Sequence, residues 1–349
     1  MEIIKLLNYK EKRFNTAVAL GNFDGIHIGH QDLIKTMVNK AKKENLKPSL
    51  LLFDTHTKSV LNSDSPSCIT SIDQKIEIAE KLGVEIVYII KFDKELMKLS
   101  ADEFVSKILI EKMNSKLIVV GFDYRFGYKA LGDSEYLKKL SSQYNFEIEV
   151  LNPVKNKGLI VSSSNIRHLI REGKMEEVET LLKRPYSMLG NVIEGASRGR
   201  KLGFPTANIE LKSNYVMPRS GVYKTYTEID GRTYKSATNI GYNPTFSKEN
   251  KLLKFETYIL DFNENIYGKT IKVYFKRHIR DDIKFDNVDD LIAQMNLDVK
   301  EVEREDWYLH FTCFMILLVY KLPIAMFIVS STFYIATGDL KKHGGVLIC

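Results

Sequence analysis

Two histidines, His27 and His30, lie three residues apart in a glycine-rich segment, Gly21–His30, that reads Gly-Asn-Phe-Asp-Gly-Ile-His-Ile-Gly-His. The apolar run before it, Thr16–Leu20, predicts a buried strand, and the apolar spacing of Gln31–Lys43 after it predicts a helix. Glycines let a backbone approach a ligand closely, and a helix start offers free N–H groups that attract phosphate. Both imidazoles can then hold the phosphates of ATP and stabilise charge on a departing pyrophosphate. We therefore expect a nucleotide site; the alternatives are two surface histidines or a metal site, for which no third ligand stands out.

Two later segments carry side chains suited to the same chemistry. Gly121–Gly127 (GFDYRFG) follows a predicted strand at Leu117–Val120, and Val161–Arg167 (VSSSNIR) places hydroxyl groups and an arginine at a predicted helix start. Hydroxyls at a helix start and a guanidinium both bind phosphate well. Taken alone, Arg125 in the first of these segments could equally be a surface ion-pair residue.

A second candidate site lies in the other half of the chain. Gly195–Asn208 (GASRGRKLGFPTAN) is rich in glycine, Thr206 offers a hydroxyl to Mg²⁺, and Asn208 offers a neutral carbonyl oxygen. Further along the chain, Glu256 lies on a predicted strand and is a carboxylate that could accept a proton. By spacing alone, a lone strand glutamate is more often an exposed surface residue. Gly195–Asn208 also carries three cations suited to phosphate groups: Arg198, Arg200 and Lys201.

The first half predicts a parallel, doubly wound α/β sheet, because apolar strand segments alternate with helical patterns. Ligands on such sheets bind beyond the carboxyl ends of the strands. A further helix over Ser164–Leu182 closes this half, and Arg184-Pro185 marks a boundary. The further strands are expected at Ser49–Phe53, Glu85–Phe92 and Phe146–Leu151, and the further helices at Ile72–Leu82, Ala101–Lys112 and Ser134–Ser142.

The second half predicts a small antiparallel β-barrel followed by a helix at Val288–Glu303. Asp230-Gly231 between two β-rich runs is a strong hairpin signal. The strands are expected at Tyr223–Ile229, Tyr234–Ile240, Lys254–Leu260 and Thr270–Phe275.

These motifs together resemble those of the bacterial bifunctional riboflavin kinase/FAD synthetases, in the family's order from Ala17 to about Glu303. The resemblance implies a nucleotidylyltransferase-like domain that adenylylates FMN, with ATP as co-substrate, and a riboflavin kinase-like domain that uses ATP and Mg²⁺. The implied partners are riboflavin, FMN and ATP. No covalent intermediate is needed in FMN adenylylation, since the FMN phosphate is already a nucleophile and positioning with charge neutralisation can carry the step.

The resemblance also assigns roles to individual residues, with His27, His30 and Glu256 as the catalytic ones. The ATP site of the adenylyltransferase is assigned to Asn22, Asp24, Gly25, His27, Gly29, His30, Ser163, Ser164 and Arg167, of which Asn22 and Asp24 shape the turn. Its FMN contacts are Asp123 and Arg125. The ATP site of the kinase is assigned to Gly195, Arg200, Lys201, Gly203, Thr206 and Asn208, with Thr206 and Asn208 as Mg²⁺ ligands, and the kinase's flavin contacts are Arg280 and Phe285.

The sequence departs from the family pattern at a few positions and leaves other functions open. Phe53–Thr57 reads FDTHT where the family tends to have F-x-P-H-P, although His56 remains; Ser164 replaces threonine, Tyr258 replaces histidine and Asp282 replaces glutamate. The alternatives are a kinase with a weak adenylyltransferase half, a non-catalytic flavin-binding regulator, and a related adenylyl- or cytidylyltransferase with another substrate.

Composition fits an intracellular enzyme of two domains. The chain has 349 residues, a net charge of +7 without a basic block, and three distant cysteines, so we expect a cytoplasmic protein that does not bind nucleic acid. The short, mixed start at Met1–Tyr9 predicts no signal peptide. The expected divisions are residues 1–183, the adenylyltransferase domain; 184–306, the kinase domain; and 307–349, an apolar tail. The tail is a membrane anchor, an extra packed element or an aberrant segment, and membrane contact is expected only through it; the oligomeric state is left open.

Overall fold

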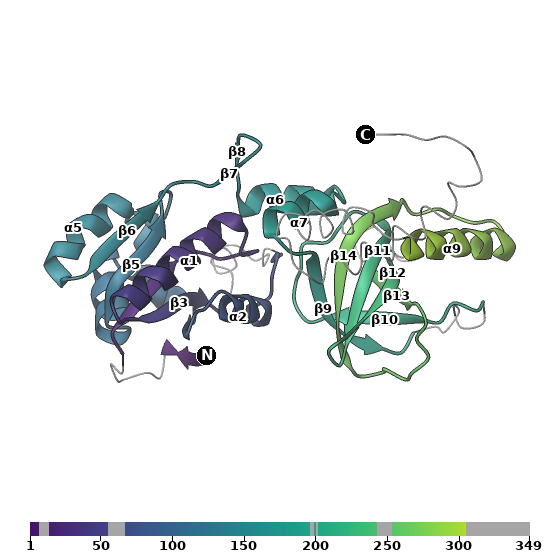
Figure 1. The fold of residues 1–349 in the computed structure, drawn as a ribbon, viewed down its shortest axis with the longest axis horizontal. Helices are drawn as coiled ribbons and strands as arrows, with labels where there is room; N and C mark the ends of the chain where they lie inside the picture. The colour runs from purple at the N-terminus through teal and green to yellow at the C-terminus, as the bar shows by residue number, and fades with distance from the viewer. Residues whose placement is uncertain (7–13, 55–66, 196–198, 200–201, 243–252, 305–349) are drawn as a thin grey trace, which may run out of the picture. The chain divides into compact units, whose positions relative to one another are not determined.

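The computed structural model describes residues 1–6, 14–54, 67–195, 199, 202–242 and 253–304. Residues Met1–Val302 form one compact unit. Figure 1 shows its helices and strands. The predictions about His56, Arg198, Arg200, Lys201 and the 307–349 tail fall outside the described residues. Among the described helices, none is long and apolar enough to cross a membrane.

A six-stranded sheet, with every pair of neighbouring strands parallel, forms the first half, in the order β1-β4-β3-β2-β5-β6. The predicted parallel sheet is confirmed, but its first edge strand was not predicted. The strands are β1 (Glu2–Lys5), β2 (Thr16–Leu20), β3 (Lys47–Phe53), β4 (Ile86–Ile90), β5 (Ser115–Gly121) and β6 (Glu147–Leu151).

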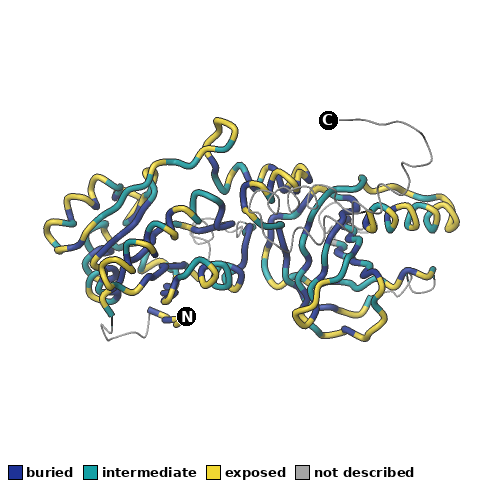
Figure 2. The backbone as a smooth tube through the Cα atoms, viewed as in Figure 1, coloured by how far each residue is buried: buried dark blue, intermediate teal, exposed yellow. Residues whose placement is uncertain are grey.

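Helices cover both faces of this sheet, because alternate residues of the central strands point to opposite sides. On one face, α1 (Ile28–Lys43) and α2 (Ile72–Lys81) pack on Ala17, Ala19 and their neighbours. On the other face, Val18 and Leu20 pack with the helices that precede and follow β5. Figure 2 shows the central strands as mostly buried: β2 is buried throughout, and β5 is buried except at Lys116 and Gly121. The helices on this second face are α4 (Ala101–Glu103), which continues as the π-helix η3 (Phe104–Lys112), and α5 (Ser134–Tyr144); the short α3 (Lys94–Lys98) precedes them. The helix expected at Ala101–Lys112 is therefore present, and most of it is a π-helix.

The strand order places a topological switch point beside β2. The chain runs from β2 to β3 and β4 on one side, and then crosses to β5 and β6 on the other side of β2. In open α/β sheets, ligands bind in the crevice beyond the carboxyl ends of the strands at such a point. Gly21, which follows β2, and Gly121, which ends β5, both lie at this edge.

One predicted helix, Ser164–Leu182, is in fact two. The chain forms α6 (Ser163–Arg171) and α7 (Met175–Leu182), separated by a turn at Gly173. Gly173 has φ +74°, a left-handed conformation that ends helices and that glycine adopts without steric cost. A two-stranded hairpin, β7 (Lys155–Asn156) and β8 (Leu159–Ile160), precedes α6.

The second half is a closed six-stranded antiparallel barrel, in the order β10-β13-β12-β11-β14-β9, as predicted. Asp230 and Gly231 have φ +48° and +78°, which fits the tight hairpin turn expected between β11 and β12. Two of its strands, β9 and β10, were not predicted. The elements are β9 (Tyr186–Ile193), β10 (Thr206–Leu211), β11 (Gly221–Ile229), β12 (Arg232–Tyr242), β13 (Leu253–Ile259), β14 (Thr270–Arg280) and the helix α9 (Val288–Glu303).

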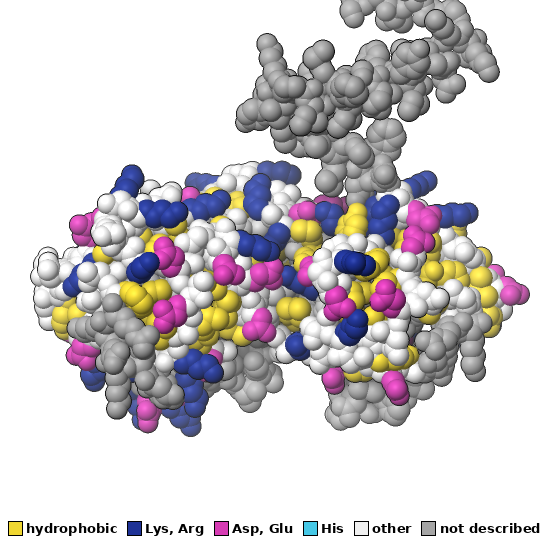
Figure 3. All heavy atoms as spheres, turned by 60° about the horizontal axis from the view of Figure 1, so that its bottom comes forward, with side chains coloured by type: hydrophobic (Ala, Val, Ile, Leu, Met, Phe, Trp, Pro, Cys, Tyr) yellow, Lys and Arg dark blue, Asp and Glu magenta, His cyan; other side chains and the backbone are white. Residues whose placement is uncertain are grey.

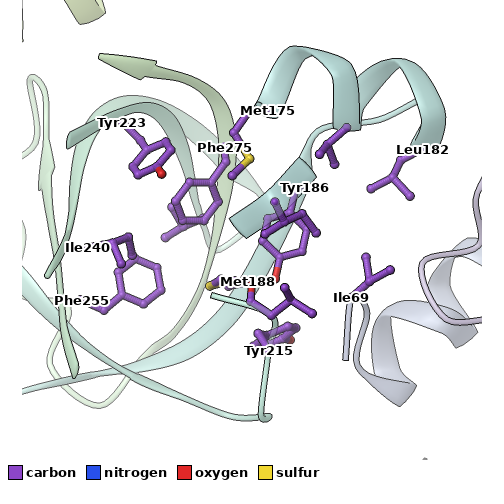
Figure 4. Close-up of a cluster of buried hydrophobic side chains, with 14 of the residues drawn as sticks. Ile69, Met175, Leu182, Tyr186, Met188, Tyr215, Tyr223, Ile240, Phe255 and Phe275 are labelled. Carbon is purple, nitrogen blue, oxygen red and sulfur yellow. Dashed lines mark hydrogen bonds between the residues drawn. The ribbon is translucent and has the colours of Figure 1, made fainter. Parts of the chain in front are cut away.

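The core of the barrel continues beyond the barrel itself. Tyr223, Phe255 and Phe275 fill its interior, and the same cluster extends through α7 to Ile69 and Leu182 (Figure 4). The barrel and the segments that precede it therefore share buried apolar surface, which is the main stabilising term in folding.

Candidate active sites

The two predicted histidines meet at the start of α1. Their rings stack with centroids 3.8 Å apart and planes 15° apart. Nδ1 of His27 accepts a hydrogen bond from the backbone N–H of His30 over 3.4 Å, so His27 caps the helix whose N–H groups face the switch point. The two imidazoles that the sequence predicts to bind one ligand therefore lie against each other.

Burial keeps both imidazoles uncharged. It lowers the pKa of His27 from 6.5 to about 4. The pKa of His30 also lies well below 6.5, first through burial and then through the charges of His27 and Lys75. Because Nδ1 of His27 accepts a hydrogen bond, the proton of the neutral ring lies on Nε2, which can donate to a phosphate oxygen.

Asp24 is a buried carboxylate, only 1% exposed, at the centre of this loop. Its Oδ1 accepts the backbone N–H groups of Ile69 (2.9 Å) and Thr70 (3.3 Å), and its Oδ2 pairs with the Arg167 guanidinium. Its backbone carbonyl accepts a hydrogen bond from Ser163 Oγ over 2.8 Å. The structure thus brings the loop and the start of α6 together, as the motifs implied.

The loop backbone is strained and tightly packed. Phe23 and Ile26, both fully buried, have φ +48° and +39°, and such non-glycine conformations cost about 1–3 kcal/mol each. Gly25 has φ +86°, and a Cβ there would meet the Ile69 side chain at 3.3 Å. Arg184 holds this backbone through the carbonyls of Gly25 and Ile26.

The remaining predicted residues of the first site border this loop. Asn22 and Ser164 are exposed, and a Cβ at Gly29 would meet the His27 ring at 3.3 Å. In the loop that follows β5, Asp123 and Arg125 are both exposed. Arg125 pairs with Asp133 over 3.3 Å, which is the surface ion pair that its sequence left open.

In the barrel, three polar residues lie side by side on adjacent strands. Glu256 on β13 is directly opposite Asn208 on β10 and Asn239 on β12. Paired residues of antiparallel strands point to the same face, so all three share one face, opposite the buried Thr238–Thr257 contact of 2.8 Å. Asn239 Oδ1 is buried and has no hydrogen-bond partner among the described residues.

This face also carries the predicted cation ligands. Thr206 and Asn208 are two residues apart on β10, so their side chains point to the same face. Their neutral oxygens fit Mg²⁺, which keeps several waters and relies on substrate phosphates. A Cβ at Gly195 would lie 1.9 Å from Asn208 Nδ2, so the glycine backbone packs directly against this side chain. Gly203 has φ +85° in the turn before β10.

Glu256 forms an ion pair with Lys254, whose Nζ lies 2.9 Å from Oε2 of Glu256. The Glu256 side chain is 20% exposed. Of the two predicted flavin contacts, Arg280 forms a bidentate pair with the buried Asp298 of α9, over 2.8 and 2.7 Å. Phe285 is half-buried in the segment before α9. No described contact joins Arg280 to Phe285.

Three residues of the first site had no sequence signal. Thr70 Oγ1 accepts the N–H of Gly25 over 3.0 Å, and Arg184 was read only as part of a domain boundary. Lys75 Nζ lies 3.3 Å from the carbonyl oxygen of Asn22. Their sequence neighbourhoods are typical of any loop or helix, and only the fold brings these three residues to the loop at residues 21–27.

An α/β sheet with paired histidines at its switch point, joined to an antiparallel barrel with a Glu–Asn face, defines a two-domain nucleotide-dependent transferase. The family model of FAD synthetase matches residues 9–165, and the family model of riboflavin kinase matches residues 182–305. The chain belongs to the bifunctional riboflavin kinase/FMN adenylyltransferase family, which confirms the resemblance seen in its motifs.

Individual relatives cover nearly all of the matched region. The bifunctional riboflavin kinase/FMN adenylyltransferase of Buchnera aphidicola subsp. Schizaphis graminum is 36% identical over 308 residues, 87% of this chain and 98% of that protein. The enzyme of the same name from Listeria monocytogenes is 38% identical over 289 residues, 82% and 91% of the two chains. A crystal structure titled macrolide-efflux protein, from Streptococcus pneumoniae, has a TM-score of 0.80 and 34% identity, covering 88% of this chain and 100% of that chain.

Proposed function

We propose that this protein phosphorylates riboflavin with ATP to give FMN, and then transfers the adenylyl group of a second ATP to FMN, giving FAD and pyrophosphate. The observation that carries the proposal is the presence of two separate sites in one compact unit. One is the stacked pair of His27 and His30 at the switch point, and the other is the Asn208–Glu256 pair on the barrel.

In adenylyl transfer, the FMN phosphate oxygen attacks the α-phosphorus of ATP, and the bond to the β-phosphate oxygen breaks. No base is required, because the nucleophile is already ionised. Neutral His27 donates Nε2–H to a phosphate oxygen, and Arg167, held by Asp24, adds positive charge beside it. The free N–H groups at the starts of α1 and α6 bind further phosphate oxygens.

In the kinase reaction, Glu256 accepts the proton of the riboflavin 5′-hydroxyl as its oxygen attacks the γ-phosphorus of ATP. Release of Glu256 from Lys254 on substrate binding frees the carboxylate for this step. Thr206 and Asn208 would hold Mg²⁺, which, when bound, neutralises charge on the transferred phosphoryl group.

The finer assignments are part of the same proposal. Asp123 and Arg125 would face FMN in the first site, while Arg280 and Phe285 would border the flavin in the second. The division into residues 1–183 and 184–306 and a cytoplasmic location also remain proposals. On the face shown in Figure 3, positive and negative side chains are interspersed, which supports the expectation of no nucleic-acid partner.

The test is chromatographic analysis of products after the full chain is incubated with riboflavin, ATP and Mg²⁺. FMN followed by FAD is expected. Glu256→Gln should abolish FMN formation and spare FAD formation from supplied FMN, and His30→Ala should do the reverse. Loss of both reactions in either variant would contradict two separate sites. Formation of FMN alone by the unaltered chain would show that the protein acts only as a riboflavin kinase.

A further inference from the structure

Lys75, on α2, faces the loop at residues 21–27 that carries His27. Lys75 Nζ lies 3.3 Å from the backbone carbonyl oxygen of Asn22, one residue after Gly21. Within the described part of the chain, no ion pair joins Lys75 to an aspartate or glutamate. The positive charge of Lys75 also helps to lower the pKa of His30.

Lys75 is half-buried. Burial lowers its pKa from 10.5, and the nearby charge of Asp24 offsets only part of this effect. Withdrawing part of a charged side chain from water is costly unless the charge is paired, and a single backbone carbonyl is a weak partner for an ammonium group. The site therefore holds a cation that gains strongly from an incoming anion.

The helix that carries Lys75 is fixed in place by its other polar residues. Gln74 Nε2 donates to Ser187 O (3.1 Å) and to Ser187 Oγ (2.9 Å) of β9. Glu77 pairs with Lys272 of β14 over 2.7 Å. These contacts hold α2 on the barrel side, so Lys75 is presented to the loop from a rigid element and needs little ordering on binding.

We propose that Lys75 is a phosphate-binding residue of the adenylyltransferase site, which contacts the β- and γ-phosphates of ATP and so stabilises the pyrophosphate that leaves. The inference rests on the proposed function of this site. The α-phosphorus–oxygen bond breaks with its electrons on the pyrophosphate oxygen, and the ammonium group of Lys75 neutralises the charge that develops there. Its position beside Asn22 and His30, at the start of α1, favours the ATP phosphates over the FMN phosphate.

The direct test is binding of inorganic pyrophosphate to the full chain by titration calorimetry. Lys75→Met should weaken this binding by about 10- to 100-fold, the usual loss for a charge-assisted hydrogen bond. It should raise the KM for ATP in FAD formation, with little change in the KM for FMN and in riboflavin phosphorylation. The matched control is Lys81→Met, on the same helix, where Lys81 is 71% exposed and pairs with Glu77; it should bind pyrophosphate as the unaltered chain does.

A second variant separates phosphate binding from support of the loop. Lys75→Gln keeps a donor for the Asn22 carbonyl but removes the charge, so it should resemble Lys75→Met. Pyrophosphate binding restored by Lys75→Gln, or a loss confined to the KM for FMN, would overturn the inference. Failure of the unaltered chain to make FAD from FMN would instead refute the proposed function.

Discussion

Acidification should destabilise the fold through His27. The folded protein keeps this ring neutral down to a pKa of about 4, whereas the unfolded chain binds the proton below 6.5. Between these values the unfolded state binds more protons, so the free energy of unfolding falls as the pH falls. From pH 7 to pH 5, the difference amounts to about 2 kcal/mol for this residue, at about 1.4 kcal/mol for each unit of pKa difference. Carboxylates contribute little in this window, because they titrate mainly below it in the unfolded chain.

The assay is urea unfolding at both pH values, followed by far-ultraviolet circular dichroism. His27→Asn keeps a side chain that can cap α1 but removes the titrating group. Between pH 7 and pH 5, the free energy of unfolding of this variant should therefore fall by about 2 kcal/mol less than that of the unaltered chain. Equal pH dependence in His27→Asn and the unaltered chain would refute the argument that burial keeps this imidazole neutral.

Three further outcomes follow from the two sites. Asp24→Asn should lower the free energy of unfolding by about 3–5 kcal/mol in urea titrations at pH 7, because it leaves the Arg167 charge uncompensated beside a buried group; a loss below about 1 kcal/mol would show that the pair behaves as a surface one. Gly195→Ala should reduce the kcat of riboflavin phosphorylation at least about tenfold, a barrier increase of about 1.4 kcal/mol, and leave FAD formation from FMN unchanged, since the added Cβ would displace Asn208; equal rates would mean that Asn208 has no part in the reaction. Chelation of divalent cations should stop FMN formation, and its recovery on adding Mg²⁺ is the check, whereas full activity in excess chelator would exclude the proposed cation ligands.

The fold was largely predictable because its signals are local. Apolar runs such as Thr16–Leu20 and the Asp230-Gly231 turn specify strands and a hairpin from a few adjacent residues. The failures have equally local causes. The helix expected at Ser164–Leu182 is interrupted because Gly173 adopts a positive φ, and no apolar pattern reports that. Strand β10 was missed because only Ile209 of Thr206–Leu211 is buried, so the segment has no apolar run that marks a strand.

The candidate sites were predictable only where the contributing residues are close in sequence. His27 and His30 stand on one helix turn, so their spacing reports their contact. Lys75 is one of two lysines on α2, and only the packing of the helix distinguishes it from Lys81. The alignment of Asn239 with Glu256 depends on strand register, which a single sequence does not give.

Asp24 joins segments that are far apart in the sequence into one site. Its carboxylate accepts the N–H groups of Ile69 and Thr70 and pairs with Arg167, while Ser163 donates to its carbonyl. The Ile69 side chain belongs to the core that continues into the barrel (Figure 4). A shift of Ile69 therefore also moves a donor of a buried carboxylate, because its backbone N–H and its side chain move together. Substitutions in this part of the core will consequently alter the geometry around Arg167, and with it FAD formation, even though none of the substituted side chains reaches the nucleotide.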